Sequence, residues 1–156
     1  MTKRSVTHST FAIERNYPAT SARVFAAFAD PVKKRRWFRE EDASESLEFD
    51  MDFRVGGRER TRFRIQGGPY DGVLCTNDTT YQDIVPDSRI VIAYTMTLGD
   101  KRISASLTTF ELMPAEGGTS LIFTEQAAFF EGADGPAMRQ DGWRLLLDKL
   151  AKEVAC

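Results

Sequence analysis

The residues from Thr7 to Tyr17 alternate between polar and apolar side chains, with Phe11, Ile13 and Tyr17 on one side. A period of two is typical of a β-strand that buries one face. Pro18 follows and cannot donate the backbone hydrogen bond that a continuing strand needs. The pattern therefore predicts a first strand that ends near Tyr17.

Two short helices are predicted after this strand. Thr20 and Ser21 each offer a side-chain oxygen that can cap a helix, and the apolar residues that follow recur every three or four positions as far as Asp30. Pro31 suits the first turn of a second helix, and the run Val32–Phe38 carries four basic residues before two aromatic ones. We therefore expect a pair of short helices ahead of the rest of the sheet.

Six further strands are predicted, each with an alternating apolar face and each bounded by glycine, proline or aspartate. The polar segment 39–46 that precedes them has no period and is predicted to be a loop. Gly56-Gly57 marks a tight hairpin, in which one of the two glycines is expected to adopt a positive φ. The six predicted strands are Leu47–Phe53, Arg58–Ile65, Val73–Ile84, Arg89–Leu98, Ile103–Leu112 and Thr119–Ala127.

The chain is predicted to close with an amphipathic helix of about five turns between Gly135 and Cys156. Its apolar face contains Trp143, Leu146, Leu147, Leu150 and Val154. A meander with an apolar inner face must bury that face, and this helix is the one predicted element large enough to cover it. The expected fold is α+β: a curved antiparallel sheet of six to seven strands wrapped around a long C-terminal helix, with two short helices after the first strand. One domain is expected over residues 1–156.

Composition narrows the function classes. The 156 residues are 42% hydrophobic and 28% charged, which is an ordinary balance for a globular protein. Twenty-one Lys+Arg against 23 Asp+Glu give a net charge of −2, which disfavours binding that neutralises many phosphates. The arginines of the stripe Arg58–Arg64 lack interleaved stacking aromatics, so we interpret them as a solvated outer face balanced by the acidic loop Glu40–Glu48. No nucleic-acid partner is expected.

Metal, redox and membrane functions are also disfavoured. Cys75 and Cys156 are isolated and are expected to be free thiols, and a lone His8 near the N-terminus excludes sites with several imidazoles. No stretch approaches the roughly 18 apolar residues of a membrane span, and the first ten residues are polar. We therefore expect a cytoplasmic protein with no metal, no cofactor and no membrane partner.

Short motifs spread from Phe11 to Leu150 carry a resemblance to a known family. They are Tyr17-Pro18-Ala19 before Val24-Phe25, Asp30-Pro31 with Trp37-Phe38, Arg54-Val55-Gly56-Gly57, Pro86 with Arg89-Ile90-Val91, Gly118-Thr119-Ser120-Leu121, and Gly142-Trp143 with Leu147 and Leu150. The sequence resembles the START-like, helix-grip superfamily, and within it the bacterial family similar to the C-terminal domain of the activator of heat-shock protein 90 ATPase. Each motif is structural in content, so none encodes a reaction.

The resemblance implies a cavity between the curved sheet and the long helix, suited to a small apolar molecule. Residues on the inner alternation, together with two aromatics at the entrance, are the candidate ligand-binding residues, although large aromatics on periodic faces also build plain cores. The candidates are Trp37, Phe38, Phe49, Phe63, Tyr94, Met96, Phe110, Phe123, Trp143 and Leu147.

Glu125 is the most informative polar candidate for ligand binding. Counting by two from Leu121 and Phe123 places it on the inner face, where a carboxylate is costly to bury and either pairs or has a raised pKa. It could hold a ligand or act as a general base, or it could sit at the strand end or pair with an arginine for structural reasons. Ser104, Ser106 and Thr108 could add hydroxyls to the same cavity.

Three functions remain open from the sequence. The first is binding of a small hydrophobic or amphipathic molecule in the cavity, with no catalytic residue. The second is a stress-response module that docks on a chaperone, as the family name suggests. The third is a cyclase- or hydrolase-type enzyme that uses Glu125. A closed core would weaken the first and third, and a second titratable group within reach of Glu125 would favour the third. The ligand and the oligomeric state, monomer or homodimer, are left open.

Overall fold

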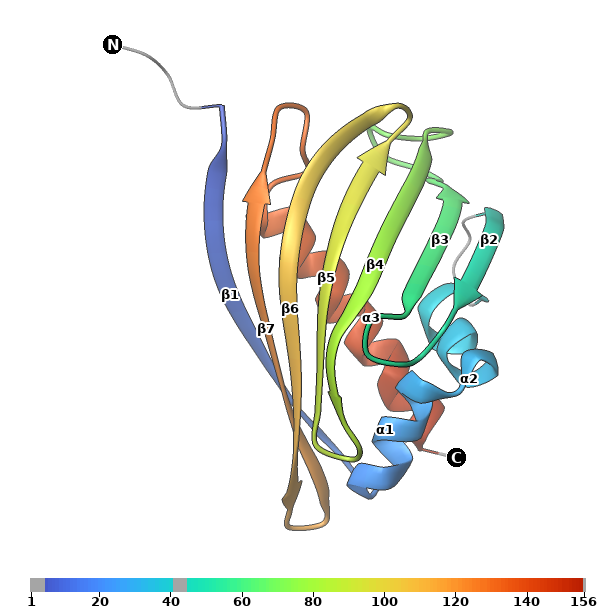
Figure 1. Ribbon diagram of the computed structural model, residues 1–156, viewed down its shortest axis with the longest axis vertical. Helices are drawn as coiled ribbons and strands as arrows, with labels where there is room; N and C mark the ends of the chain where they lie inside the picture. The colour runs from blue at the N-terminus through green and yellow to red at the C-terminus, as the bar shows by residue number, and fades with distance from the viewer. Residues whose placement is uncertain (1–4, 41–44, 156) are drawn as a thin grey trace.

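In the computed structural model, which describes residues 5–40 and 45–155, an antiparallel sheet of seven strands curves around one long helix (Figure 1). The strand order is β1-β7-β6-β5-β4-β3-β2. The α+β helix-grip fold expected from the sequence is thus confirmed. The elements are β1 (Thr7–Tyr17), α1 (Ser21–Ala29), α2 (Pro31–Arg35), the π-helical turn η1 (Arg36–Glu40), β2 (Glu45–Met51), β3 (Arg58–Arg64), β4 (Leu74–Val85), β5 (Arg89–Leu98), β6 (Lys101–Ala115), β7 (Gly118–Phe129) and α3 (Pro136–Val154).

The two short helices are capped by side chains at their N-termini. The Thr20 hydroxyl accepts a hydrogen bond from the Arg23 amide, and Asp30 accepts one from the Val32 amide. The predicted second helix is divided into α2 and η1. The Nε1 of Trp37, in η1, donates a hydrogen bond to the Ala27 carbonyl of α1 at 2.8 Å. This bond anchors η1 against α1, so the aromatic residues of η1 face the sheet.

The hairpin between β2 and β3 begins earlier than expected. β2 ends at Met51, because residues 52–57 form a turn in which the amides of Arg54 and Gly57 donate to the carbonyls of Asp52 and Arg54. Gly56 has a φ of 83°, as expected for one of the two glycines. Of the predicted loop 39–46, the residues at both ends belong to η1 and β2, and residues 41–44 lie outside the described residues.

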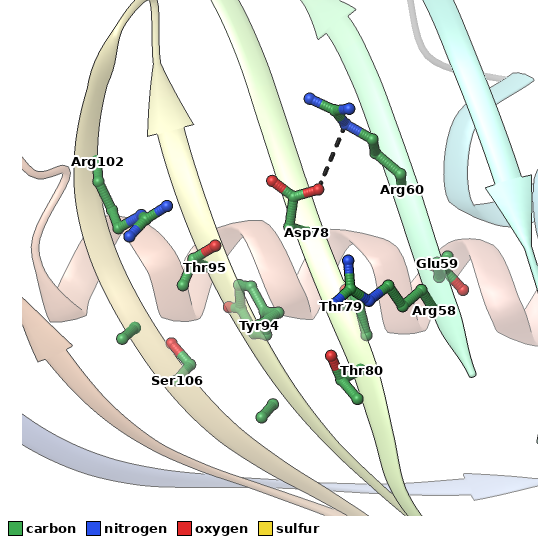
Figure 2. Close-up of a pocket in the computed structure, with 12 residues that line it drawn as sticks. Arg58, Glu59, Arg60, Asp78, Thr79, Thr80, Tyr94, Thr95, Arg102 and Ser106 are labelled. Atoms are coloured by element: carbon green, nitrogen blue, oxygen red, sulfur yellow. Dashed lines mark ion pairs between the residues drawn. The ribbon is translucent and has the colours of Figure 1, made fainter. Parts of the chain in front are cut away.

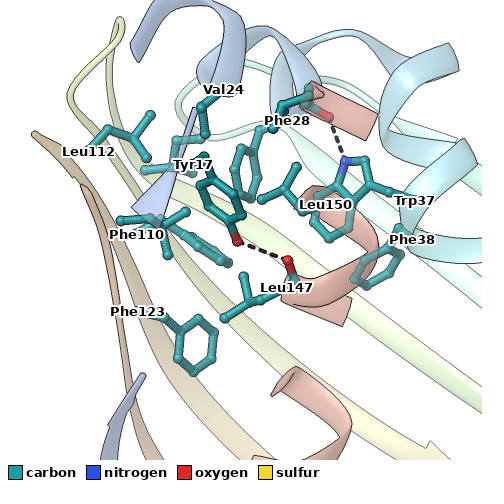
Figure 3. Packing of buried hydrophobic residues seen from close by; sticks show 14 of the residues in the cluster. Tyr17, Val24, Phe28, Trp37, Phe38, Phe110, Leu112, Phe123, Leu147 and Leu150 are labelled. Atoms are coloured by element: carbon teal, nitrogen blue, oxygen red, sulfur yellow. Dashed lines mark hydrogen bonds between the residues drawn. The ribbon is translucent and has the colours of Figure 1, made fainter. Parts of the chain in front are cut away.

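The core lies between the inner face of the sheet and α3 (Figure 3). The buried residues of α3 recur every three or four positions along the helix. They are Arg139, Trp143, Leu147, Leu150 and Val154. Tyr17 ties β1 to this helix, since its hydroxyl donates to the Leu147 carbonyl at 2.9 Å. Within the described part of the chain, none of the helices has the length and apolar character needed to cross a membrane.

Gly142 lies on the exposed side of α3, and a Cβ atom added there would meet no atom within 4 Å. Glycine in a helix interior is less favourable than alanine by roughly 0.5–1 kcal/mol. We expect Gly142→Ala to raise the free energy of unfolding by about that amount, measured by urea denaturation. A lower midpoint in the variant would show that the position needs a conformation that alanine does not adopt.

Candidate functional site

Two small cavities lie against the inner face of the sheet, the larger bordered also by α2, η1 and α3 and the smaller by α1 and α2. The larger has a volume of about 30 Å³ and the smaller about 10 Å³. Cavities of this size have room for only about one or two water molecules. Their shared wall consists of Lys34, Glu59, Thr79, Ile92 and Phe110. Side chains therefore fill most of the interior in which the sequence predicts a ligand.

Five of the predicted ligand-binding residues surround the larger cavity. They are Trp37, Phe38, Tyr94, Phe110 and Trp143. All five are buried and belong to one aromatic cluster, in which neighbouring rings pack edge-to-face or tilted. The two aromatics from η1 thus meet those from β5, β6 and α3 at one place.

The other predicted residues lie around this cavity without lining it. Phe123 and Leu147 are fully buried in the core, and Phe49 packs against the core while partly buried. The guanidinium of Arg39 covers the ring of Phe63 at 3.8 Å, on the β2–β3 side of the sheet. Met96 contacts the Arg139 guanidinium through its sulfur at 3.4 Å.

A buried ion pair stands in the wall that the two cavities share. Lys34 Nζ lies 3.0 Å from Glu59 Oε1, and both side chains are about nine-tenths buried or more. The Tyr81 hydroxyl donates to the same oxygen at 2.6 Å. The ammonium also lies 4.7 Å from the centre of the Phe38 ring. One charged pair is therefore enclosed by aromatic side chains.

A second polar cluster surrounds Glu125, which is 0% exposed. Its Oε1 accepts hydrogen bonds from the Tyr94 hydroxyl at 2.7 Å and from the Thr108 hydroxyl at 3.0 Å. Oε2 has no hydrogen-bond partner among the described residues. Trp143 Nε1 donates to the Tyr94 oxygen at 3.3 Å. The parity count that places Glu125 on the inner face is correct.

Arg139 connects this cluster to the N-terminal end of α3. Its guanidinium donates to the Tyr94 oxygen at 3.1 Å and to Ser104 Oγ at 2.9 Å. Two further bonds of 2.8 Å run to the Asp134 carboxylate, which is the geometry of a bidentate pair. Arg139 thus joins α3, β5 and β6 through one buried charge.

Burial governs the titration of these groups. It raises the pKa of Glu125, while the hydrogen bond from Tyr94 and the charge of Arg139 oppose the rise. Burial likewise raises the pKa of the Tyr94 hydroxyl. Cys75 is a free thiol, as expected, and burial raises its pKa to about 11; Cys156 lies outside the described residues. At neutral pH the tyrosine and the thiol are therefore protonated.

A sequence profile of the family described as "Activator of Hsp90 ATPase homolog 1-like protein" matches residues 18–155. The chain belongs to this family. An uncharacterized protein from Rhizobium leguminosarum, whose structure has been solved, is 42% identical, with 99% of both chains covered and a TM-score of 0.90. A protein from Rhizobium loti is 51% identical over 96% of this chain and 99% of its own, with a TM-score of 0.85.

A more distant AHSA1-like protein from Aeromonas hydrophila is 20% identical, covers 94% of this chain and 92% of its own, and has a TM-score of 0.69. At this identity the likeness shows the fold alone. No curated protein matches the chain. The AHSA1-like family and the fold it implies are therefore established, and they are compatible with ligand binding.

Three charged residues of this interior site are not among the candidates predicted from the sequence, although each has a positional signal. Lys34 precedes Trp37 and Phe38 by three and four residues, so it shares their helical face. Glu59 alternates with the exposed arginines of β3 and therefore faces inward. Arg139 precedes Trp143 by one helical turn. Their charge argues against a buried position, because lysine, glutamate and arginine are rarely buried unless they are paired.

The pH dependence of stability provides a test of the Glu125 environment. A carboxyl whose pKa is raised by folding contributes stability below its unfolded pKa of about 4.3, and this contribution is lost as the pH rises through the folded value. Glu125→Gln removes that titration. We expect the free energy of unfolding of the variant, relative to the original protein, to increase as the pH rises from about 4.3 through the raised pKa of the folded protein. A pH-independent difference in urea denaturation would place the carboxylate in a water-like environment.

Proposed function

We propose that the protein binds a small amphipathic molecule between the sheet and α3, beneath α2 and η1. The observation that carries this proposal is the Lys34–Glu59 ion pair in the wall shared by the two cavities. Aromatic rings would hold the apolar part of the molecule, and the ion pair would hold its polar head.

The energetics of buried ion pairs support this role. Replacement of such a pair by apolar residues of similar volume is often neutral or stabilising, because desolvation offsets the mutual attraction. Stability alone is therefore a weak reason for Lys34 and Glu59 to be buried among aromatics. A ligand with an anionic head can take the place of Glu59 beside the ammonium, and a cationic head can replace Lys34 beside the carboxylate and Tyr81.

Entry of such a molecule requires the site to open, since the larger cavity measures about 30 Å³. Small-molecule sites usually enclose roughly 300–1,000 Å³. The α2–η1 segment is short, and its first π-helical residue, Arg36, forms two hydrogen bonds of 2.9 and 2.8 Å with Glu153 near the end of α3. We expect this segment to move away from α3 when the ligand binds.

Tryptophan fluorescence offers a direct experiment, because both tryptophans of the chain, Trp37 and Trp143, line the larger cavity. Dodecanoic acid and dodecylamine serve as probes with an anionic and a cationic head. We expect a saturable fluorescence change with at least one of them. The double variant Lys34→Met/Glu59→Met keeps the side-chain volume and removes both charges, so its affinity should fall by about tenfold or more.

The matched control is Lys101→Met, which removes an exposed lysine from the start of β6. Its affinity for the probe should equal that of the original protein. Equal losses in the control and in the double variant would show that the loss is not specific to the buried ion pair and would contradict the proposal. The absence of any saturable change with both probes would contradict the proposal.

The two alternative functions receive less support. Tyr94 supplies the second titratable group beside Glu125 that an enzyme would need, but Glu125 is not among the residues that line either interior cavity. Docking on a chaperone rests on the family description, which names an activator of the Hsp90 ATPase. The buried ion pair favours ligand binding over both.

A further inference from the structure

A groove of about 570 Å³ crosses the face of the sheet that points away from α3 (Figure 2). It runs over β3, β4, β5 and β6, and α3 lies behind the sheet in this view. Its volume lies within the roughly 300–1,000 Å³ of small-molecule sites. Glu59, Thr79 and Tyr94 border both this groove and the larger interior cavity, but their side chains are buried, so the groove opens on the other face of the sheet from that cavity.

Small side chains at paired positions of neighbouring strands form the floor of this outer groove. Thr80 on β4 lies opposite Ala93 on β5, and Thr95 on β5 lies opposite Ala105 on β6. Outward-facing side chains normally cover a sheet, but alanine and threonine are short. The floor is therefore shallow, flat and able to form hydrogen bonds through two hydroxyls.

Arginines stand at both ends of the groove. Arg58 extends from β3 over β4, and Arg102 extends from β6 toward Thr95 (Figure 2). Both are exposed, and neither forms an ion pair with any residue that the structure describes. Arg60 lies 3.3 Å from Asp78, so that arginine and that carboxylate neutralise each other. The groove thus carries two uncompensated positive charges at opposite ends.

We propose that this outer groove binds a small metabolite with two phosphate groups, one at Arg58 and one at Arg102. A guanidinium donates two parallel hydrogen bonds to a phosphate, which favours this anion over a single point charge. The backbones of β3 and β6 are three strand spacings apart, or about 14 Å, and both side chains lean inward. The two hydroxyls of the floor suit a polar body, such as a sugar, between the phosphates.

Calorimetric titration tests this proposal with fructose 1,6-bisphosphate as the probe and inorganic phosphate as the single-anion comparison. We expect one saturable site for the bisphosphate and weaker binding of phosphate. Arg58→Gln and Arg102→Gln should each weaken bisphosphate binding by about tenfold or more. Ala93→Leu should weaken it similarly, because the added side chain fills the floor without changing the charge.

The matched control is Arg64→Gln, which removes the same charge from the same strand but lies outside the groove. It should bind the bisphosphate as the original protein does. Thermal melts of each variant establish that it is folded. If Arg64→Gln weakened bisphosphate binding as much as Arg58→Gln and Arg102→Gln do, the loss would be an effect of overall charge, and the proposal would be overturned. The absence of bisphosphate binding at millimolar concentration would also overturn it.

Discussion

Trp143→Ala is expected to lower the free energy of unfolding by about 3–5 kcal/mol, the usual cost of truncating a large buried aromatic residue. The indole lies 4.7 Å from the ring centre of Phe123 and 5.9 Å from that of Phe110. Its Nε1 also donates to the Tyr94 oxygen. Truncation removes these contacts and leaves a cavity in the middle of the α3–sheet interface, which urea denaturation followed by circular dichroism measures directly.

Leu145→Ala is the control, because Leu145 is 58% exposed on the opposite side of the same helix. Its effect should stay within about 0.5 kcal/mol. If Trp143→Ala shifted the denaturation midpoint no more than Leu145→Ala does, then Trp143 would not belong to the core. The anchoring of α3 would then have to come from the leucines of its buried face.

Arg139→Met is expected to cost a similar amount, about 3–5 kcal/mol, for an electrostatic reason. The variant keeps much of the side-chain volume, but it leaves the Asp134 carboxylate without its bidentate partner. It also removes the donors to the Tyr94 oxygen and to Ser104. Unpaired buried charges are far more costly than unpaired surface charges, so the loss should be large in urea denaturation.

The comparison variant is Arg144→Met on the next turn of α3. Arg144 lies 3.3 Å from Asp141, and both side chains are at least half exposed. Exposed pairs of this kind contribute roughly 0–1 kcal/mol, so Arg144→Met should be nearly neutral. Equal effects of the two substitutions would show that water screens Arg139 as it screens a surface residue.

Much of the fold could be predicted because its strands carry a strict period of two. The bounds expected for β1 and β5 agree with the structure, and the inward direction of Glu125 follows from the same count. Boundaries differ where a turn intervenes, as at Phe53, or where pairing continues through exposed residues, as at both ends of β6. The hydrophobic pattern predicts which face of a strand is buried. It predicts less well the residue at which strand pairing stops.

The candidate site was less predictable, because it depends on pairs of residues far apart in sequence. Lys34 and Glu59 are buried together, and neither would be expected inside alone. The volume left between side chains also depends on how the aromatic rings of η1, β5, β6 and α3 pack against one another. Alternation identifies inward residues, but it does not show whether they enclose a space or fill it.

The location of a bound probe tests the central claim most directly. In a protein with labelled methyl groups, nuclear Overhauser effects from bound dodecanoic acid or dodecylamine identify the side chains that contact it. We expect contacts to the methyl groups of Ile92, which belongs to the wall shared by both interior cavities. Contacts confined to exposed methyl groups, such as those of Leu107 and Leu145, would contradict binding between the sheet and α3.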